Sequence, residues 1–310
     1  MRKMAKKIVR LLTDRDYRFM VLSSHGLCDT MDDEEYLKRK FRAVMGRELD
    51  LENPRTFNEK LQWLKLYNRK PEYTMMVDKV LVRDYIARTI GEEYLIPLLG
   101  VWDDPDEIDF DKLPDQFVLK CNHNSGLGMC ICKDKSKLDI EKVRSELRKG
   151  LKQDYYLPHR EWPYKDVPRK ILCEKYMGDG SGELKDYKFM SFGGEVKCSF
   201  VCSDRFSPGG LRVTFFDRNW EVMPFERHYP KSDLPIEKPQ SYDKMLSLAE
   251  KLSVGIPFVR VDLYEISGHP YFGELTFFPG SGYEEFTPES WDAKLGDWIT
   301  LPEKTGSGRK

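Results

Sequence analysis

The feature that most constrains the fold is a pair of apolar segments, "FVRVDLYEI" and "YFGELTFF", joined by the turn-forming residues "SGHP". Both segments are rich in β-branched and aromatic residues, so they predict two buried strands in an antiparallel hairpin. If the pairing is centred on Gly268, Asp262 lies opposite Glu274 and Arg260 lies opposite Thr276. Because side chains alternate between the two faces of a sheet, these four residues then share one face.

The two facing carboxylates need a positive partner. Carboxylates directly opposed on a hairpin repel each other, and a buried carboxylate without a cation is costly. In one interpretation, a divalent cation lies between Asp262 and Glu274, and the oxygen-only ligand set favours Mg²⁺ or Mn²⁺ over Zn²⁺. In the other, Arg260 forms salt bridges with both acids and no metal binds. The hairpin alone leaves both interpretations open.

The composition is that of a globular protein. The 310 residues are 40% hydrophobic and 33% charged, and 51 basic residues nearly balance 52 acidic ones, so we expect no nucleic-acid partner. No apolar stretch reaches the roughly 18 residues of a transmembrane helix, although the basic N-terminal helix could contact an anionic membrane peripherally. The seven cysteines form no C-x-x-C pair, which indicates a reduced, cytoplasmic protein.

The first third of the chain has the pattern of helices. Thr56 and Glu59 are spaced as a capping box at the start of an amphipathic helix. A second helix is predicted over residues 77–90, with Gly91 ending it. We therefore expect residues 1–115 to form a mainly helical region.

From residue 116 onward the pattern changes to strands. Before the hairpin, strands are predicted over residues 116–120, 129–133, 170–177, 186–192, 195–203 and 212–217. Helices are predicted over residues 140–155 and 242–252, with Asp139 and Ser241 as their N-caps. This is an α+β pattern with mostly antiparallel strands, and it excludes the regular alternation of a parallel doubly wound sheet.

The hairpin sequence resembles the metal-binding end of ATP-grasp ligases. In that superfamily, R-x-D on one strand and E-x-N on the next are followed by a Pro-Gly turn, and this chain has "VRVDLY" and then "GELTFFPGSG". The resemblance implies that Asp262 and Glu274 bind magnesium and that Arg260 stabilises the transferring phosphoryl group. Thr276 replaces the usual Asn as the third metal-site residue, so one metal or two remains open. Residues 280–282 would present backbone N–H groups to the acceptor.

The resemblance also implies a phosphate site upstream. Lys120, at the end of a strand, precedes a loop of small residues over residues 121–128. The backbone N–H groups of Ser125, Gly126 and Gly128 would cradle phosphate oxygens, and the loop would act as a mobile lid. An ordinary hairpin loop with an exposed lysine is the alternative.

The adenine site is implied by "ILCEKYM", which resembles the hinge strand of the superfamily. Glu174 and Lys175 stand at the hinge positions. Tyr176 and Met177 are candidates for packing against the adenine ring. These four residues would together bind the base.

The ribose and the γ-phosphate are implied by "KDYKF", which follows the glycine-rich residues 178–183. Asp186 would bind the ribose hydroxyls. Lys188 lies two residues further on, and therefore on the same strand face, where it would act on the γ-phosphate. A surface salt bridge is the alternative for this pair. The P-loop pattern is absent, and the glycine-rich stretch precedes a strand, so neither a P-loop nor a dinucleotide fold is indicated.

Three stretches of the sequence point to one branch of this superfamily. "NPRTFNEKLQWLKLYNR", "DYKFMSFGGEVK" and "FGELTFFPGSG" together resemble the TupA-like branch of ATP-grasp proteins, which is implicated in cell-envelope and capsular polysaccharide assembly. The likeness runs from about residue 35 to 298. The implied ATP-grasp fold has two antiparallel β-rich lobes with flanking helices, over residues 116–173 and 174–300, followed by a flexible tail over residues 301–310.

The implied activity is that of an ATP- and Mg²⁺-dependent carboxylate–amine ligase. A substrate carboxylate would form an acyl phosphate, and an amine would capture it. The carboxylate would come from a uronic acid on a polysaccharide or from an amino acid. The basic and aromatic residues 155–170 would line a site for an acidic saccharide or, alternatively, form an exposed loop.

Two other functions remain open. A metal-dependent glycosyltransferase that uses a nucleotide sugar would recruit D-x-D pairs such as Asp104/Asp106 or Asp109/Asp111, although these lie in an acidic connector. A non-catalytic ATP-grasp-like scaffold would keep the fold without turnover.

Overall fold

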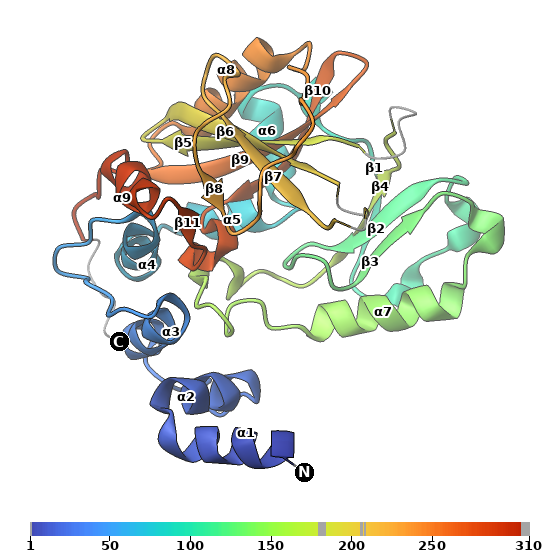
Figure 1. Cartoon of the computed structure of the whole chain (residues 1–310). Coiled ribbons are helices and arrows are strands. Elements are labelled where there is room, and N and C mark those ends of the chain that lie inside the picture. The colour runs from blue at the N-terminus through green and yellow to red at the C-terminus, as the bar shows by residue number, and fades with distance from the viewer. Residues whose placement is uncertain (1, 179–183, 205–206, 208, 305–310) are drawn as a thin grey trace.

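The computed structural model describes residues 2–178, 184–204, 207 and 209–304, and two antiparallel sheets dominate it (Figure 1). The first sheet has the order β1 (Leu98–Trp102), β4 (Ile171–Lys175), β2 (Phe117–Cys121) and β3 (Met129–Cys132). The second sheet has the order β10 (His269–Thr276), β9 (Phe258–Ile266), β5 (Asp186–Phe192), β6 (Glu195–Ser203) and β7 (Arg212–Phe216). A short ribbon pairs β8 (Glu226–Arg227) with β11 (Phe286–Thr287). The predicted α+β class with two antiparallel β-rich lobes is confirmed.

Helices flank both sheets. The α-helices are α1 (Arg2–Thr13), α2 (Arg15–Ser24), α3 (Asp33–Met45), α4 (Phe57–Tyr67), α5 (Glu72–Val77), α6 (Val82–Thr89), α7 (Ile140–Lys152), α8 (Tyr242–Ser253) and α9 (Ser290–Asp297). The 3₁₀ helices are η1 (Glu92–Tyr94), η2 (Pro105–Glu107), η3 (Phe110–Lys112), η4 (Lys135–Lys137), η5 (Trp162–Tyr164) and η6 (Pro279–Gly282). The glycine-rich residues 179–183 and residues 305–310 of the predicted flexible tail lie outside the described residues.

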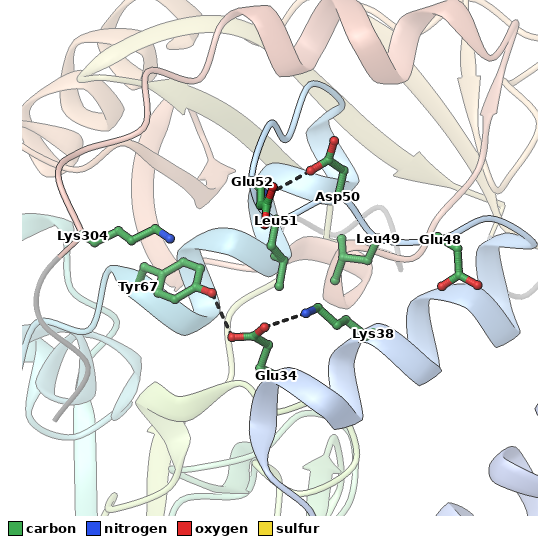
Figure 2. A pocket seen from close by; sticks show the side chains of 9 residues that line it. All are labelled: Glu34, Lys38, Glu48, Leu49, Asp50, Leu51, Glu52, Tyr67 and Lys304. Atoms are coloured by element: carbon green, nitrogen blue, oxygen red, sulfur yellow. Dashed lines mark hydrogen bonds and ion pairs between the residues drawn. The ribbon is translucent and has the colours of Figure 1, made fainter. Parts of the chain in front are cut away.

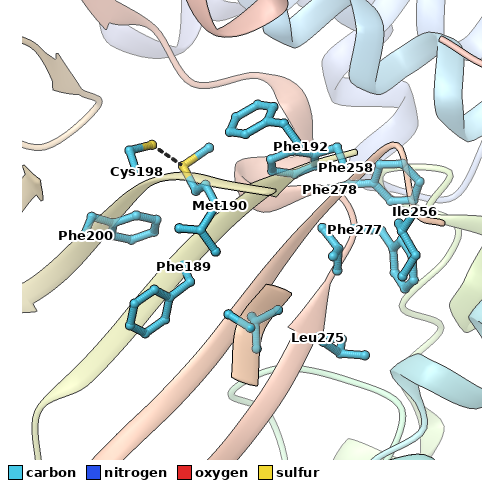
Figure 3. Packing of buried hydrophobic residues seen from close by; sticks show 14 of the residues in the cluster. Phe189, Met190, Phe192, Cys198, Phe200, Ile256, Phe258, Leu275, Phe277 and Phe278 are labelled. Carbon is cyan, nitrogen blue, oxygen red and sulfur yellow. Dashed lines mark hydrogen bonds between the residues drawn. The ribbon is translucent and has the colours of Figure 1, made fainter. Parts of the chain in front are cut away.

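The two sheets have separate hydrophobic cores. The core of the first sheet contains Phe117 and Leu119 of β2 and Leu147 of α7. The core of the second sheet also takes in α3 and α4, and Phe57 of α4 packs edge to face on Phe258 with ring centroids 5.0 Å apart (Figure 3 shows Phe258 among its neighbours). The N-terminal helices from α3 onward are therefore part of the second lobe's core.

The first sheet includes a strand from the region that we expected to be mainly helical. β1 pairs with β4, so residues 98–102 join this sheet. β4 runs across the predicted boundary between residues 173 and 174. The predicted division therefore cuts through one strand, because four buried residues of β4 belong to the first sheet before the chain crosses to the second.

The predicted pairing of the last hairpin is confirmed. Glu274 lies opposite Asp262, and Thr276 lies opposite Arg260. β9 pairs in turn with β5, where Lys188 lies opposite Asp262. Three neighbouring strands thus bring their polar side chains to one face of the second sheet. The other face is covered by α8, which contacts β5, β6 and β9.

This register depends on a β-bulge that sequence reasoning missed. The hairpin turn is formed by residues 267–268, which both have positive φ, 52° and 76°. Continued without a break, that turn would place Glu274 opposite Val261 and on the apolar face. The bulge at Gly273 adds one residue and restores the polar face. A β-carbon at Gly273 would lie 3.0 Å from the Tyr264 ring and 3.1 Å from the Asp262 backbone oxygen, so a larger residue there would require a small shift of these neighbours.

One predicted helix start and one predicted capping hydrogen bond need correction. The capping box of Thr56 and Glu59 is confirmed. The helix predicted over residues 77–90 begins instead at Val82, because the Asp78 side chain accepts hydrogen bonds from two following backbone N–H groups and forms a turn. Ser241 does not cap α8, since its hydroxyl donates to Glu265 at 2.5 Å.

Candidate functional site

The polar face of the second sheet carries a compact group of charges. Arg260 donates two hydrogen bonds of 2.6 Å to Asp262 and one of 3.1 Å to Glu274. Lys188 bridges Asp186, at 2.5 Å, and Asp262. The hydroxyl of Thr276 donates to Glu274 at 3.3 Å. The structure thus brings together the residues that the sequence predicted for the metal and phosphoryl end of the site.

Burial and mutual attraction set the charge states in this group. Burial alone would raise the pKa of Asp262, but Arg260 and Lys188 outweigh it and hold that pKa below its usual value. Burial would likewise lower the pKa of Lys188, but Asp186 and Asp262 hold it above its usual value. For Asp186, burial dominates and raises the pKa, although Lys188 opposes the shift. Three carboxylates therefore share two cations in a largely buried site.

The first sheet contributes a second charged group. Lys120 lies 2.7 Å from Glu174, and Arg83 of α6 lies 3.4 Å from the other oxygen of the same carboxylate. Arg83 also donates to the backbone oxygen of Ile96 at 2.8 Å. Glu174 thus holds the long side chains of two cations in place. Lys120 and Glu174 were predicted, whereas Arg83 was not.

The two charged groups lie within electrostatic reach of each other. Asp186, Glu274 and Asp262 of the second sheet and Glu174 of the first all raise the pKa of Tyr264, together with burial. Burial lowers the pKa of Lys79, and Glu274 and Glu174 oppose that shift. The Lys79 ammonium donates to the backbone oxygen of Asn124 at 2.7 Å. The site is therefore shared between the sheets, and Lys79 joins Arg83 among the residues that sequence reasoning missed.

Exposed apolar side chains cover the same face of the first sheet as Lys120 and Glu174. Register places Ile131, Leu98 and Glu174 in one row across the strands, and Met129 beside Lys120. Leu98, Met129 and Ile131 are 38%, 49% and 53% exposed. An apolar surface next to two cations suits the flat ring and the phosphates of a nucleotide.

The loop over residues 121–128 is anchored at its start. Asn122 and Asn124 are buried, and their side chains donate to the backbone oxygens of Pro168 and Gly150. Only residues 125–127 are exposed. The part of the loop that can move over a ligand is therefore shorter than the predicted lid, and it includes Ser125 and Gly126, whereas Gly128 is packed against α7.

The predicted hinge residues lie at the end of β4 and directly after it. Lys175 is exposed, and its backbone N–H donates to the Pro97 oxygen at 2.9 Å. Tyr176 and Met177 are half-buried, and the Lys133 ammonium lies 5.8 Å from the centroid of the Tyr176 ring. The adenine-binding role of these residues stays a prediction.

Two other predicted assignments need correction. The backbone N–H of Ser281 already donates to the Phe278 oxygen at 2.8 Å, so it is not free to bind an acceptor. The segment 155–170 is not an exposed loop, because Tyr156, Arg160 and Glu161 within it are buried. Arg160, for example, donates to backbone oxygens between α2 and α3, which ties this segment to the N-terminal helices.

The sequence profile of the TupA-like ATP-grasp family matches residues 59–300. The chain belongs to that family. The match includes the predicted nucleotide and metal residues of both sheets, and the ATP-grasp fold inferred from the sequence is confirmed. The family is part of the ATP-grasp ligase superfamily, whose members couple ATP to the joining of a carboxylate and an amine.

Solved structures similar to this TupA-like protein are ATP-grasp ligases. D-alanine–D-alanine ligase from Bacillus anthracis, complexed with ATP, is 20% identical, with a TM-score of 0.40, over 73% of this chain and 65% of that chain. A second structure of that ligase is 17% identical, with a TM-score of 0.44, over 93% of both chains. The D-alanine–D-alanine ligase from Helicobacter pylori is 14% identical, with a TM-score of 0.43, over 79% of this chain and 69% of that chain. No curated protein sequence matches the chain.

The carboxylates of the TupA-like site fit a magnesium ion. Among the described residues, no three His, Cys, Asp or Glu side chains are grouped to hold a metal by themselves. Magnesium in phosphoryl-transfer sites, however, usually takes one or two carboxylates and completes its shell with water and substrate phosphates. Asp262 and Glu274, which face each other on the hairpin, would supply those two. Asp186 Oδ1 is buried without a hydrogen-bond partner within the described chain. The donor set is hard oxygen with an excess of negative charge, which is the chemistry magnesium requires.

Two cavities lie away from the paired carboxylates. One, of about 460 Å³, is lined by Glu34, Glu48, Asp50 and Glu52 together with two lysines and Tyr67 (Figure 2). Its four carboxylates make it unsuitable for a nucleotide. The other, of about 910 Å³, borders the hinge.

Within the part of the chain that the structure describes, none of the helices has both the length and the apolar character to cross a bilayer.

Proposed function

We propose that this chain is an ATP- and Mg²⁺-dependent ligase that joins a carboxylate to an amine through an acyl phosphate. The observation that carries the proposal is the contact of Arg260 with both facing carboxylates, Asp262 and Glu274, on the hairpin. A structural salt bridge would need one carboxylate for one guanidinium. Here a third carboxylate, Asp186, and a buried Lys188 belong to the same group, and such a surplus of buried charge is typical of a functional site.

ATP would lie between the two sheets. The exposed apolar face of the first sheet would cover the adenine ring next to the hinge residues, with Asp186 near the ribose. Lys120 and Arg83 would pair with phosphate oxygens, for which Glu174 orients them. Ser125 and Gly126 would close over the phosphates from the exposed part of the loop.

The chain's own cations would drive phosphoryl transfer. Lys188 and Arg260, both fixed by Asp262, would stabilise the charge that develops on the γ-phosphoryl group as a substrate carboxylate attacks it. The products are ADP and an acyl phosphate, and an amine then displaces inorganic phosphate to form an amide. Magnesium held by Asp262 and Glu274 would supply further neutralisation of the phosphates.

The acceptor is proposed to be a uronic-acid or amino-acid carboxylate used in cell-envelope or capsular polysaccharide synthesis. This step of the proposal rests on the family to which the chain belongs. We place the protein in the cytoplasm, with the basic helix α1 available for peripheral contact with the membrane.

The experiment is a turnover assay with Mg-ATP and pairs of uronic acids and amino acids, in which ADP release is measured. Release should require both a carboxylate and an amine, and Glu274→Gln and Lys120→Met should abolish it. Lys142→Met on the exposed side of α7 is the matched control and should behave as wild type.

Calorimetric titration with Mg-ATP and with a UDP-sugar separates the alternative functions. Binding of the UDP-sugar alone would favour a glycosyltransferase over the ligase. Binding of Mg-ATP without turnover would indicate a scaffold.

The structure accounts for the aspartates that a glycosyltransferase would use. Asp104 caps η2 by accepting the backbone N–H of Asp106, and Asp109 caps η3 in the same way. Asp106 pairs with Arg148 at 2.5 Å. These carboxylates stabilise local turns and an ion pair, so no observation favours the glycosyltransferase.

A further inference from the structure

A buried carboxylate lies beside the proposed site without an ion-pair partner among the described residues. Glu161 precedes η5 and is 5% exposed. Its carboxylate accepts a hydrogen bond of 2.5 Å from the Ser281 hydroxyl. Burial raises the pKa of Glu161, and Lys65 and the hydrogen bond from Ser281 oppose that shift.

The nearest buried cation is already fully engaged. Lys65 of α4 donates to Gln62 Oε1 at 3.0 Å, to the His159 backbone oxygen at 3.0 Å and to the Ser281 backbone oxygen at 2.8 Å. An ammonium group has three N–H donors, so Lys65 has none left for Glu161. Burial also lowers the pKa of Lys65 to about 7, and Glu161 opposes that shift.

Two tyrosine side chains are influenced electrostatically by both Glu161 and the metal hairpin. The rings of Tyr155 and Tyr164 pack edge to face with centroids 4.8 Å apart. Burial and then Glu161 raise the pKa of both phenols; Glu274 raises it further, and Arg260 opposes the shift. Both tyrosines are thus within the fields of Glu161 at one end and of the phosphoryl-transfer residues at the other.

We propose that Glu161, with the rings of Tyr155 and Tyr164, binds the primary ammonium group of the amine substrate. This inference rests on the proposed ligase function and assigns one of its two substrates a place. A buried carboxylate with a hydroxyl on one oxygen supplies the charge that an ammonium group needs, and aromatic faces attract cations. Ser281, which donates to Glu161, belongs to η6, and η6 follows directly after the strand β10 that carries Glu274.

Other ligands fit this cluster less well. An anionic group would be repelled by the Glu161 carboxylate. A divalent metal would require several oxygen ligands, whereas this cluster offers one carboxylate and three hydroxyls. The ammonium ion needs only one carboxylate and accepts aromatic neighbours. The cluster therefore selects the protonated amine.

The binding test uses saturation-transfer NMR on the full chain with Mg-ADP present. The probes are ethanolamine, L-alanine, L-lysine and L-glutamate, each compared with the analogue that lacks the amino group: ethylene glycol, propionate, hexanoate and glutarate. At least one ammonium probe should bind while its analogue does not, and Glu161→Gln should lower the affinity for that probe by about tenfold or more. Glu289→Gln, at an exposed position, is the matched control and should bind as wild type.

Two outcomes overturn the inference. One is that no ammonium probe binds the wild type in preference to its analogue. The other is that Glu161→Gln binds as tightly as wild type. If Glu161→Gln fails to fold, Ser281→Ala, which keeps the carboxylate, and Tyr164→Leu, which removes one ring, replace it. Each should weaken the ammonium probe by a few-fold, and unchanged binding in both overturns the inference.

A second readout separates this inference from the ligase proposal. Hydroxylamine, which is uncharged at neutral pH, can capture an acyl phosphate without an ammonium subsite. Glu161→Gln should therefore keep ATP- and carboxylate-dependent hydroxamate formation while losing capture by the ammonium probe. If wild type forms no hydroxamate with any uronic or amino acid, the ligase proposal fails, and the NMR result still decides whether Glu161 binds ammonium groups.

Discussion

Asp262 and Glu274 contact the same guanidinium but differ in burial, with side chains that are 2% and 35% exposed. Asp262→Asn leaves Arg260 and Lys188 with an uncompensated buried charge, so we expect it to lower the free energy of unfolding by about 3–5 kcal/mol. Glu274→Gln changes a partly solvated contact and should cost less than about 1 kcal/mol. Urea denaturation measures both values.

The two variants differ in what they report. If Glu274 serves as a metal ligand, Glu274→Gln should abolish Mg²⁺-dependent ATP turnover although the fold is intact. A loss of stability from Glu274→Gln as large as that from Asp262→Asn would instead assign Glu274 a structural role. Circular dichroism of each variant provides the control for folding.

Lys65 makes stability depend on pH in the alkaline range. Burial lowers its pKa in the folded protein to about 7, whereas an unperturbed lysine has a pKa of 10.5. Between these values the unfolded chain binds more protons than the folded chain, so the contribution of Lys65 to stability increases as the pH rises. We expect the stability of wild type relative to Lys65→Met to increase between about pH 7 and about pH 10.

Unfolding free energies of both proteins across this range test the prediction. Lys40, whose pKa burial lowers to about 8, is present in both proteins, so its own contribution largely cancels in the difference. A difference that stays flat with pH would mean that Lys65 is an ordinary charged lysine in the fold.

At the scale of the residue, sequence reasoning succeeded where one local rule sufficed. Period-two alternation placed Arg260 with Asp262 on one strand and Asp186 with Lys188 on another. Glu274 was predicted opposite Asp262, but it lies there only because of the bulge at Gly273. Arg83, Lys79 and Glu161 were missed because their significance depends on partners far away in the chain. Nothing near Glu161 in the sequence indicates that Ser281 provides its hydrogen bond.

At the scale of the element, the contact between α7 and the phosphate loop is set by two glycines. A β-carbon at Gly150 would lie 2.7 Å from both Cys121 Sγ and the Gly128 α-carbon. Gly→Ala in a helix interior normally adds about 1 kcal/mol of stability. Here we expect Gly150→Ala to lower stability by about 1–3 kcal/mol through overpacking and to raise the KM for ATP, because the loop is displaced.

The control is Ser145→Ala, an exposed position on the same helix. It should leave the KM for ATP unchanged and stability equal or slightly higher. If Gly150→Ala behaves like Ser145→Ala in urea denaturation and in the KM measurement, the loop does not depend on its contact with α7.

The strands were predicted better than the helices of this chain. The strands over residues 186–192 and 195–203 have the predicted ends, because alternation and glycines define both of them. The helix start near residue 77 was wrong, since an aspartate side chain competed with the backbone for hydrogen bonds. The expectation of an exposed loop over residues 155–170 was wrong because Arg160 donates to backbone oxygens of the distant turn between α2 and α3, which composition does not reveal.

At the scale of the whole molecule, the proposed nucleotide site is divided between two sheets with separate cores (Figure 1). Lys120 and Arg83 belong to the first-sheet group, whereas Lys188 and Arg260 lie on the second. A ligand held by both groups stabilises each sheet in proportion to its binding free energy, about 2.7 kcal/mol at a hundredfold excess over Kd. We therefore expect a non-hydrolysable Mg-ATP analogue to slow amide hydrogen exchange in both sheets at once.

Hydrogen exchange with mass-spectrometric readout can follow β2–β4 and β5–β10 separately. Lys120→Met should weaken binding of the analogue and reduce the protection from amide hydrogen exchange in both sheets together. The reason is that the loss of one contact lowers the occupancy of the whole site. Protection confined to the second sheet would mean that the ligand is bound there alone and that the cations of the first sheet only form ion pairs with Glu174. The sequence predicted residues on each sheet, but only the fold, which brings the charged groups of the two sheets within electrostatic reach of each other, makes them one proposed site whose parts should respond together.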